Sequence, residues 1–252
     1  MPTTIEQINS LIGGYTDLKA YYEGVRAGIE DRVQYALSET PNFKREIYVN
    51  QTLGDNSATG QWNAPVASIG EAVSRVPSGG LLVLHVQGDY HVTEIIRPDN
   101  IALDIRGAGA GKPRITFGWV ASIEEPGKIE RMAGFQPRNR AEFRFHALEL
   151  ELPADIVTPM VYSHMNGIVA GTQSAHPGVV SIKFSEVDFA LAAGSVEATI
   201  CGQSPAFTAI NFQACTFPAN FKGRVVKGRG GEGVNPDSVS RFVVTNLSPN
   251  YA

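Results

Sequence analysis

The chain has 252 residues, of which 43% are apolar and 18% are charged, so it can bury a full core and is not a disordered protein. A formal net charge of -4 argues against a dedicated nucleic-acid-binding protein, and two cysteines do not form a disulfide framework. No stretch approaches the roughly 18–20 apolar residues of a membrane span, so we expect no membrane-spanning segment.

Residues 1–40 are predicted to be helical. Their apolar positions recur at steps of three and four, which places them on one helical face. Gly13–Gly14 is expected to interrupt the helix. The apolar stripe needs a partner, which is either the rest of the chain or two sister helices in a short parallel three-helix bundle. We interpret it as a trimerisation segment with these contact residues: Ile5, Ile8, Ile12, Leu18, Tyr22, Val25 and Ile29.

After residue 41 the pattern becomes strand-like. Three short apolar runs are predicted strands: Ile47–Val49, Leu82–Val86 and Ile101–Ile105. Between the first two runs, Ser68 and Glu71 have the spacing of a capping box, which predicts a short helix. Residues 118–140 and 154–180 show few clear periods and are expected to be outer loops.

A short phrase recurs four times in the second half of the chain. Its first, third and sixth positions are apolar each time, and its eighth position is apolar in three of the four copies. Every second residue is apolar at first, the alternation then shifts by one residue, and every second residue is apolar again. This pattern predicts two short strands bent around a corner over a shared core. The copies are FRFHALEL (143–150), IKFSEVDF (182–189), INFQACTF (210–217) and, more loosely, FVVTNLSP (242–249).

The copies begin 39, 28 and 32 residues apart. Such recurrence is typical of stacked coils, each of which cannot bury its apolar face alone. We therefore predict an all-β body formed by a parallel β-helix over residues 41–252. A β-sandwich is the alternative, since it also contains short alternating strands with turns between them.

Residues 45–110 carry a further pattern. A strand is followed by the turn Gly54–Asn56, a short Ala-containing helix, the segment Pro77–Gly80, another strand and Gly88–Tyr90. This order resembles the start of pectin-lyase-like right-handed β-helices. The resemblance implies that residues 41–252 form a right-handed parallel β-helix. It implies little about activity, because that fold hosts lyases, hydrolases, adhesins and inert spikes.

The N-terminal stretches Thr4–Asn9 and Tyr15–Gly24 resemble virion-anchoring segments of tailed-bacteriophage fibres and spikes. Together the two parts of the chain resemble a phage tail spike or tail fibre, in which an N-terminal α-helical anchor joins a β-helical shaft. The resemblance implies a homotrimer that contacts other virion proteins through residues 1–40 and a host surface polysaccharide through its body. The departure from that family is size, since residues 41–252 leave room for few coils.

The start of the chain agrees with this resemblance. Met1–Glu6 lacks both the basic start and the apolar run of a signal peptide. We therefore expect a virion protein that is made in the host cytoplasm.

Glu149 and Asp188 occupy the same outward position in successive phrases, so they stack if their strands are neighbours about 4.8 Å apart. A glycan-cleaving spike needs two carboxylates across a groove, about 5–10 Å apart. The alternative is a solvated outer face on which Arg144 and Lys183, in the neighbouring column, offset the charges. We favour this alternative, so the sequence favours a structural role over an enzyme.

The five histidines show no metal-ligand spacing, and the binding role needs no metal or cofactor. Aromatic and basic residues in or near predicted loops are candidates for glycan contact, with burial or a solvated loop as the alternative. These candidates are Trp62, Trp119, His164, Arg224 and Arg229.

Three functions remain open. The first is a structural virion protein, a trimeric tail spike or fibre that attaches to host surface glycans through several weak sites on one rigid shaft. The second is a polysaccharide depolymerase on the same scaffold, a glycoside hydrolase or lyase that uses Glu149 and Asp188 or a pair shared between subunits. The third is a head-decorating or connecting virion component without host contact.

Overall fold

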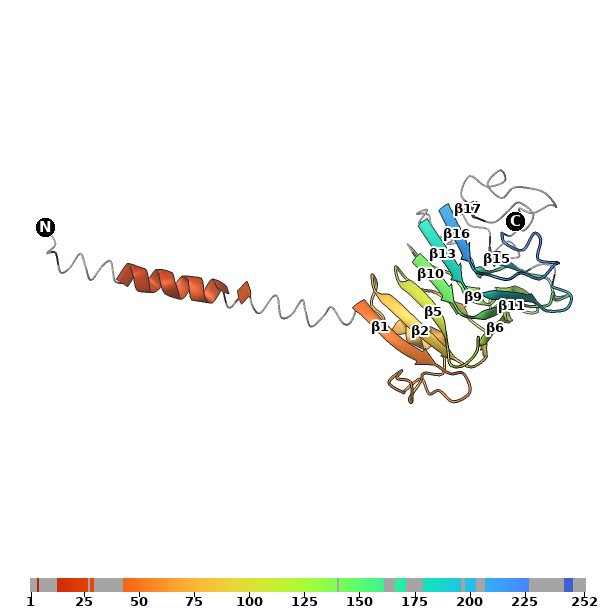
Figure 1. Ribbon diagram of the computed structural model, residues 1–252, viewed down its shortest axis with the longest axis horizontal. Coiled ribbons are helices and arrows are strands. Elements are labelled where there is room, and N and C mark those ends of the chain that lie inside the picture. Colours follow the sequence, from red (N-terminus) through yellow and green to blue (C-terminus); the bar gives the residue numbers. More distant parts are fainter. Residues whose placement is uncertain are drawn as a thin grey trace. The chain divides into compact units, whose positions relative to one another are not determined.

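Alternating apolar residues in the second part of the chain form short parallel strands that lie side by side (Figure 1). The computed structural model describes residues 4, 13–26, 28–29, 43–139, 141–160, 166–170, 179–195, 198–202, 207–226 and 243–246. The chain divides into two units, Met1–Asn42 and Phe43–Ala252.

The largest sheet of the second unit has seven strands, and every neighbouring pair in it is parallel. The order across this seven-stranded sheet follows the order in the sequence, so each new strand is added at the same edge. The strands are β1 (Lys44–Val49), β2 (Leu81–Gln87), β5 (Ala102–Ala108), β10 (Ala141–His146), β13 (Val179–Ser185), β16 (Phe207–Gln213) and β17 (Val243–Thr245).

Two four-stranded parallel sheets complete the body. The second sheet contains β3 (Tyr90–Val92), β6 (Arg114–Phe117), β11 (Glu149–Leu152) and β14 (Asp188–Leu191). The third sheet contains β4 (Ile95–Ile96), β9 (Gly134–Phe135), β12 (Gly167–Val169) and β15 (Thr199–Cys201). The chain visits the seven-stranded, second and third sheets in this order four times, beginning with β2, β5, β10 and β13. A separate antiparallel pair joins β7 (Trp119–Ala121) to β8 (Ile129–Met132).

The sheets exclude a β-sandwich and show strands in two segments that were expected to be outer loops. Parallel pairing within all three sheets excludes the β-sandwich, whose sheets are antiparallel. The prediction that residues 118–140 and 154–180 are only outer loops is wrong, because β9 and β12 lie in them. These strands have two and three residues, too few to show an alternating period.

The one-residue shift in the repeated phrase is a backbone corner between the seven-stranded sheet and the second sheet. The fifth position of the first three copies has a positive φ, with values of 51° at Ala147, 56° at Glu186 and 52° at Ala214. This left-handed conformation bends the chain and shifts the alternation of its side chains by one residue. The apolar side chains before and after the corner therefore point into the same core, as predicted.

The register of the first three copies is also confirmed. Phe143 lies opposite Ile182, and Ile182 lies opposite Ile210. The predicted register of the fourth copy is wrong, because Ile210 lies opposite Thr245 and not opposite Phe242. This copy begins with three consecutive apolar residues, so alternation alone does not fix which of them faces the core.

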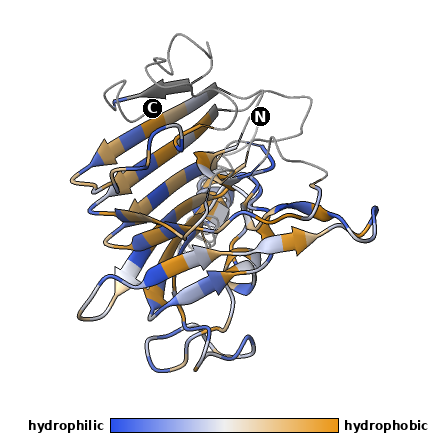
Figure 2. Ribbon diagram, turned by 90° about the vertical axis from the view of Figure 1, so that its right-hand side faces the viewer, coloured by the Kyte–Doolittle hydropathy of each residue, from blue (hydrophilic) through white to orange (hydrophobic). Residues whose placement is uncertain are grey.

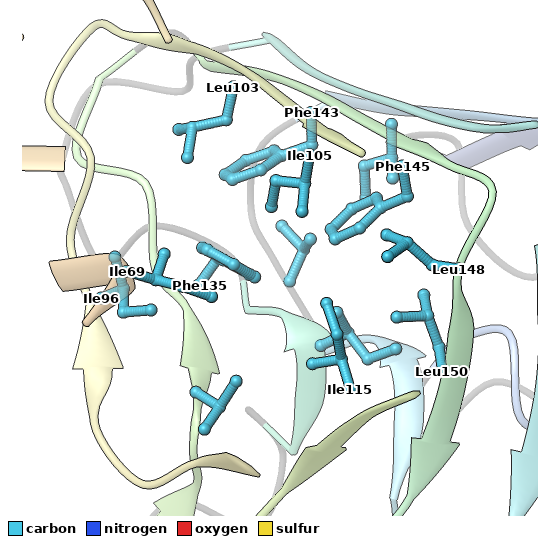
Figure 3. Packing of buried hydrophobic residues seen from close by; sticks show 14 of the residues in the cluster. Ile69, Ile96, Leu103, Ile105, Ile115, Phe135, Phe143, Phe145, Leu148 and Leu150 are labelled. Carbon is cyan, nitrogen blue, oxygen red and sulfur yellow. The ribbon is translucent and has the colours of Figure 1, made fainter. Parts of the chain in front are cut away.

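Apolar side chains from all three sheets fill a continuous interior (Figure 3). Aromatic rings stack from one circuit of the chain to the next. The ring centroids of Phe145 and Phe184 are 5.1 Å apart, and those of Phe184 and Phe212 are also 5.1 Å apart. The strands alternate hydrophobic and hydrophilic residues (Figure 2), so the outer face of the seven-stranded sheet carries polar side chains.

The short helix α2 (Ile69–Ser74) forms where the capping box predicts it. Ser68 is the N-cap, and its hydroxyl accepts a hydrogen bond from the backbone N–H of Glu71 at 3.1 Å. Ile69, Ala72 and Val73 are buried, so the helix covers part of the core. The reciprocal half of the capping box does not form, because the Ser68 N–H donates to Asn56 Oδ1 and Glu71 Oε1 accepts from Arg75 Nε.

In the first unit, residues 13–26 and 28–29 are helical. The predicted interruption at Gly13–Gly14 is wrong, since both residues lie in the helix. The described part of the apolar stripe is exposed, with exposed fractions of 53% for Leu18, 63% for Tyr22, 42% for Val25 and 57% for Ile29. The other contact residues predicted there lie outside the described residues: Ile5, Ile8 and Ile12.

Candidate functional site

Glu149 on β11 and Asp188 on β14 lie opposite each other on neighbouring parallel strands of the second sheet, in the register that the repeat predicts. Their side chains are 27% and 39% exposed. Neighbouring strands are about 4.8 Å apart, which is close to the separation of about 5–5.5 Å between the carboxyl groups of retaining glycosidases. Their availability for acid–base chemistry therefore depends on their partners.

Each of these carboxylates is ion-paired. Arg114 Nε lies 2.8 Å from Glu149 Oε1, and Lys112 Nζ lies 2.6 Å from Asp188 Oδ2. The Thr216 hydroxyl donates to Asp188 Oδ1 at 2.6 Å. The Lys112 ammonium, helped by this hydroxyl, holds the pKa of Asp188 below its ordinary value. Asp188 therefore stays ionised and is unsuited to donate a proton as a general acid.

The expectation that Arg144 and Lys183 offset these two charges is wrong. They lie opposite each other on β10 and β13 of the seven-stranded sheet. The charges on the second sheet are offset by cations just before and at the start of β6. That segment lies outside the repeated phrase, so the repeat could not identify these partners.

The outer face of the seven-stranded sheet carries an open groove of about 280 Å³ over β5, β10 and β13. Outward side chains from these consecutive strands form two rows. One row runs through Asp104, Arg144 and Lys183, and the neighbouring row runs through Arg106, His146 and Ser185. Each strand thus contributes at least one basic side chain. We call this site, made of the six residues in the two rows, the cationic groove.

Two carboxylates hold the arginines of the groove in place. Arg106 Nη2 donates to Oδ2 of the buried Asp104 at 2.6 Å. Arg144 donates to Glu142 Oε1 through both Nε (2.9 Å) and Nη2 (2.7 Å). Lys183 is exposed and makes no hydrogen bond or ion pair within the described residues. Lys183 is therefore an exposed cation without a counter-charge in the described part of the chain.

Aromatic side chains continue the row of Arg106 towards β1. His85 on β2 lies opposite Arg106, and Tyr48 on β1 lies opposite His85. The rings of Tyr48 and His85 stack at 4.6 Å, and Trp62 meets Tyr48 edge-on at 5.4 Å. Burial holds the pKa of His85 below its ordinary value, so its imidazole carries no charge at neutral pH.

The other candidates for glycan contact have different surroundings. Trp119 is partly buried against the core, and its indole N–H donates to a backbone carbonyl at 2.9 Å. Arg224 also donates to a backbone carbonyl at 2.9 Å. His164 and Arg229 lie outside the described residues. Among the described candidates, Trp62 alone is linked to the cationic groove by described contacts, which run through Tyr48 and His85.

Sequence reasoning missed Asp104 and Arg106 as residues of the groove. A signal for them was present, because the run Leu103–Ile105 alternates in the same way as the repeated phrase. β5 pairs with β10 in the corresponding register. Aligning that run with the first copy of the phrase places Asp104 beside Arg144 and Arg106 beside His146.

Within the described ranges, no three His, Cys, Asp or Glu side chains form a group that could hold a metal ion. The same part of the chain contains no helix that is long and apolar enough to cross a membrane. Comparison of the chain with protein-family models, with curated proteins and with solved structures gives no match.

Proposed function

We propose that this chain is a subunit of a structural virion protein, a trimeric phage tail spike or fibre that attaches to host surface glycans. We further propose that its body is a right-handed parallel β-helix. The path of the chain supports this, because it visits three parallel sheets in the same order in four circuits. Stacked circuits give a rigid body whose outer faces repeat from strand to strand.

The cationic groove is the observation that carries a binding function. It gathers basic, acidic and hydroxyl side chains on an exposed face at the regular spacing of the strands. Such groups donate to and accept from sugar hydroxyls, and the nearby Trp62 adds exposed aromatic surface. Glu149 and Asp188 are both ion-paired, which favours binding over hydrolysis.

The exposed stripe of the N-terminal helix supports a trimer. Its apolar residues follow the alternating steps of three and four that a coiled-coil seam requires: Tyr15, Leu18, Tyr22, Val25 and Ile29. An unpartnered helix of this length is marginal in water. Association of three copies buries the stripe and also joins three binding faces, which strengthens attachment without any new contact at each site.

Two measurements test this proposal. Antibody labelling of phage particles purified from cells that express the chain is expected to mark the tail, and binding to the isolated host surface polysaccharide is expected to saturate. Labelling on the head, without glycan binding, would favour a head-decorating component. Labelling at no position on the particle would reject a virion protein.

A polysaccharide depolymerase is the second candidate, because Glu149 and Asp188 lie opposite each other on neighbouring strands. It predicts new reducing or unsaturated ends when the protein is incubated with host capsule or lipopolysaccharide. Glu149→Gln and Asp188→Asn should abolish that product, whereas Lys128→Gln, in an exposed ion pair with Glu125, should not. Retained binding without any cleavage product would leave attachment as the function.

A further inference from the structure

We infer that the ligand of the cationic groove is an anionic glycan, which lies across the strands and places its acidic groups against Lys183 and Arg144. This inference rests on the proposed attachment function and specifies the ligand of that site. Three features of the groove carry it: the direction in which cations recur, the charge left unbalanced, and the polar and aromatic side chains around them.

The cations of the groove recur across the strands. β5, β10 and β13 are consecutive in the sheet, and they present Arg106, Arg144 and Lys183 on its outer face. Neighbouring strands are about 4.8 Å apart, so these three side chains start from positions that span roughly 10 Å. A polymer lying across the strands therefore meets a cation at each step, whereas one lying along β5 or β13 meets a single cation.

The internal ion pairs of the groove leave a cationic centre on β10 and β13. Asp104 offsets Arg106, and Glu142 offsets Arg144. Lys183 has no such partner among the described residues. Arg144 bonds Glu142 through Nε and Nη2, which leaves its Nη1 donors for a ligand. A carboxylate or sulfate group is therefore held most strongly between Arg144 and Lys183, where charge-assisted hydrogen bonds form.

Hydrogen-bonding groups around this centre favour a glycan over other polyanions. Ser185 and His146 lie in the row beside Lys183 and Arg144. Asn211 on β16 lies opposite Lys183 and extends the row of Arg144 and Lys183 with an amide group. Hydroxyl, amide and imidazole groups exchange hydrogen bonds with sugar hydroxyls. The exposed carboxylate of Glu142 also accepts from hydroxyls, but it repels the closely spaced phosphates of a nucleic acid.

The aromatic cluster gives the groove an apolar end. Trp62 is 57% exposed and meets Tyr48, which stacks on His85 beside Arg106. An aromatic ring with an open face packs against the apolar face of a pyranose. A glycan that extends from Lys183 towards β1 therefore meets cations first and aromatic surface last.

Binding of the full chain to matched oligosaccharides tests the inference. The probes are oligogalacturonate, a heparin oligosaccharide as the sulfated form, a neutral galactose oligomer of the same length, and single-stranded DNA. At low salt we expect an acidic oligosaccharide to bind about tenfold more tightly than the neutral one, which corresponds to about 1.4 kcal/mol. The difference should shrink as salt is added, because salt screens exposed charges.

A matched pair of variants locates the binding site. Lys183→Gln is expected to weaken binding of the acidic oligosaccharide about tenfold and to leave binding of the neutral one unchanged. Lys128→Gln makes the same change of charge in an exposed ion pair outside the groove and should leave both affinities unchanged. Lys183 is exposed, so the thermal midpoint should stay the same and confirm that the variant folds.

Each contrary outcome overturns the inference. These outcomes are no binding to either acidic oligosaccharide, equal affinity for acidic and neutral probes, equal effects of the two variants, and tighter binding to DNA than to the acidic glycans. If the protein still binds the host polysaccharide, the attachment function stands and only the ligand class is rejected. If the host polysaccharide does not bind either, both proposals fall.

Discussion

Arg131 on β8 is a charged side chain that is only 2% exposed. Its Nη2 donates to Gln136 Oε1 at 3.0 Å, whereas Nη1 is buried and has no hydrogen-bond partner in the described part of the chain. Arg97 donates to the same Gln136 oxygen at 3.3 Å, which brings a second cation close. Burial, together with Arg97, lowers the pKa of Arg131 to about 10. A buried cation of this kind costs stability rather than supplying it.

We therefore expect Arg131→Met to leave the free energy of unfolding unchanged or to raise it by about 1–3 kcal/mol, because methionine fills the space without a buried charge. Gln136 keeps the donor from Arg97. Since the pKa of Arg131 is lowered in the folded state, the buried charge destabilises the fold to its full extent at any pH below about 10. Urea unfolding at neutral pH measures this effect. A loss of more than about 3 kcal/mol would instead show that a counter-charge holds Arg131.

The ion pair between Lys112 and Asp188 makes stability depend on pH. The pKa of Asp188 is lower in the folded state than its ordinary value of 3.8, so the pair stabilises the fold above that value and is lost as the pH falls through the folded-state value. Both side chains are at least one-third exposed, so the contribution is less than about 1 kcal/mol. Asp188→Asn should lower the thermal midpoint at neutral pH. Wild type and variant should converge in acid, and a difference that persists there would contradict this account.

The corner residue Glu186 tests the backbone geometry of the repeat. It is exposed and has a φ of 56°, a conformation that costs a residue with a side chain about 1–2 kcal/mol. We expect Glu186→Gly to raise the free energy of unfolding by about 0.5 kcal/mol, because greater freedom of the unfolded chain offsets part of the gain. Glu186→Val, whose branched side chain fits this region poorly, should be destabilising. Equal effects of the two substitutions in urea unfolding would show that the corner is not strained.

At the scale of elements, sequence predicted most where a pattern repeats. The phrase fixes the register of β10, β13 and β16, and with it the facing positions of Glu149 and Asp188. It could not locate the third sheet, because strands of two or three residues have no period. It also could not identify Lys112 and Arg114 as partners of the carboxylates, because those contacts join segments far apart in sequence.

The N-terminal helix carries an element-scale prediction. Replacing Leu18 and Val25 by lysine should convert the proposed trimer into a monomer in sedimentation, because charges at the seam positions of a coiled coil oppose association. Ala20→Lys adds a charge two residues from Leu18, on another face of the helix, and should leave the trimer intact. Wild type that is monomeric at all concentrations would reject the trimer directly.

At the scale of the whole molecule, the core residues stabilise the fold and the surface residues are available for binding. The interior repeats from circuit to circuit with apolar side chains such as Phe145, Phe184 and Phe212. The outer faces vary, with ion pairs on the second sheet and the cationic groove on the seven-stranded sheet. Because the core depends only on the inward positions of each strand, outward positions are free to change for a ligand.

This separation predicts the result of deleting residues 1–42. All three sheets and the groove lie in Phe43–Ala252, so the truncated chain should keep its thermal midpoint and its affinity for a single oligosaccharide. Its binding to immobilised polysaccharide should weaken about a hundredfold, because the proposed trimer joins three sites and the truncated chain has one. It should also fail to enter virions when it is the only copy supplied. A truncated chain that still enters virions would reject the anchoring role of residues 1–40. A truncated chain that binds immobilised polysaccharide as tightly as the full chain would show that attachment does not depend on the N-terminal unit.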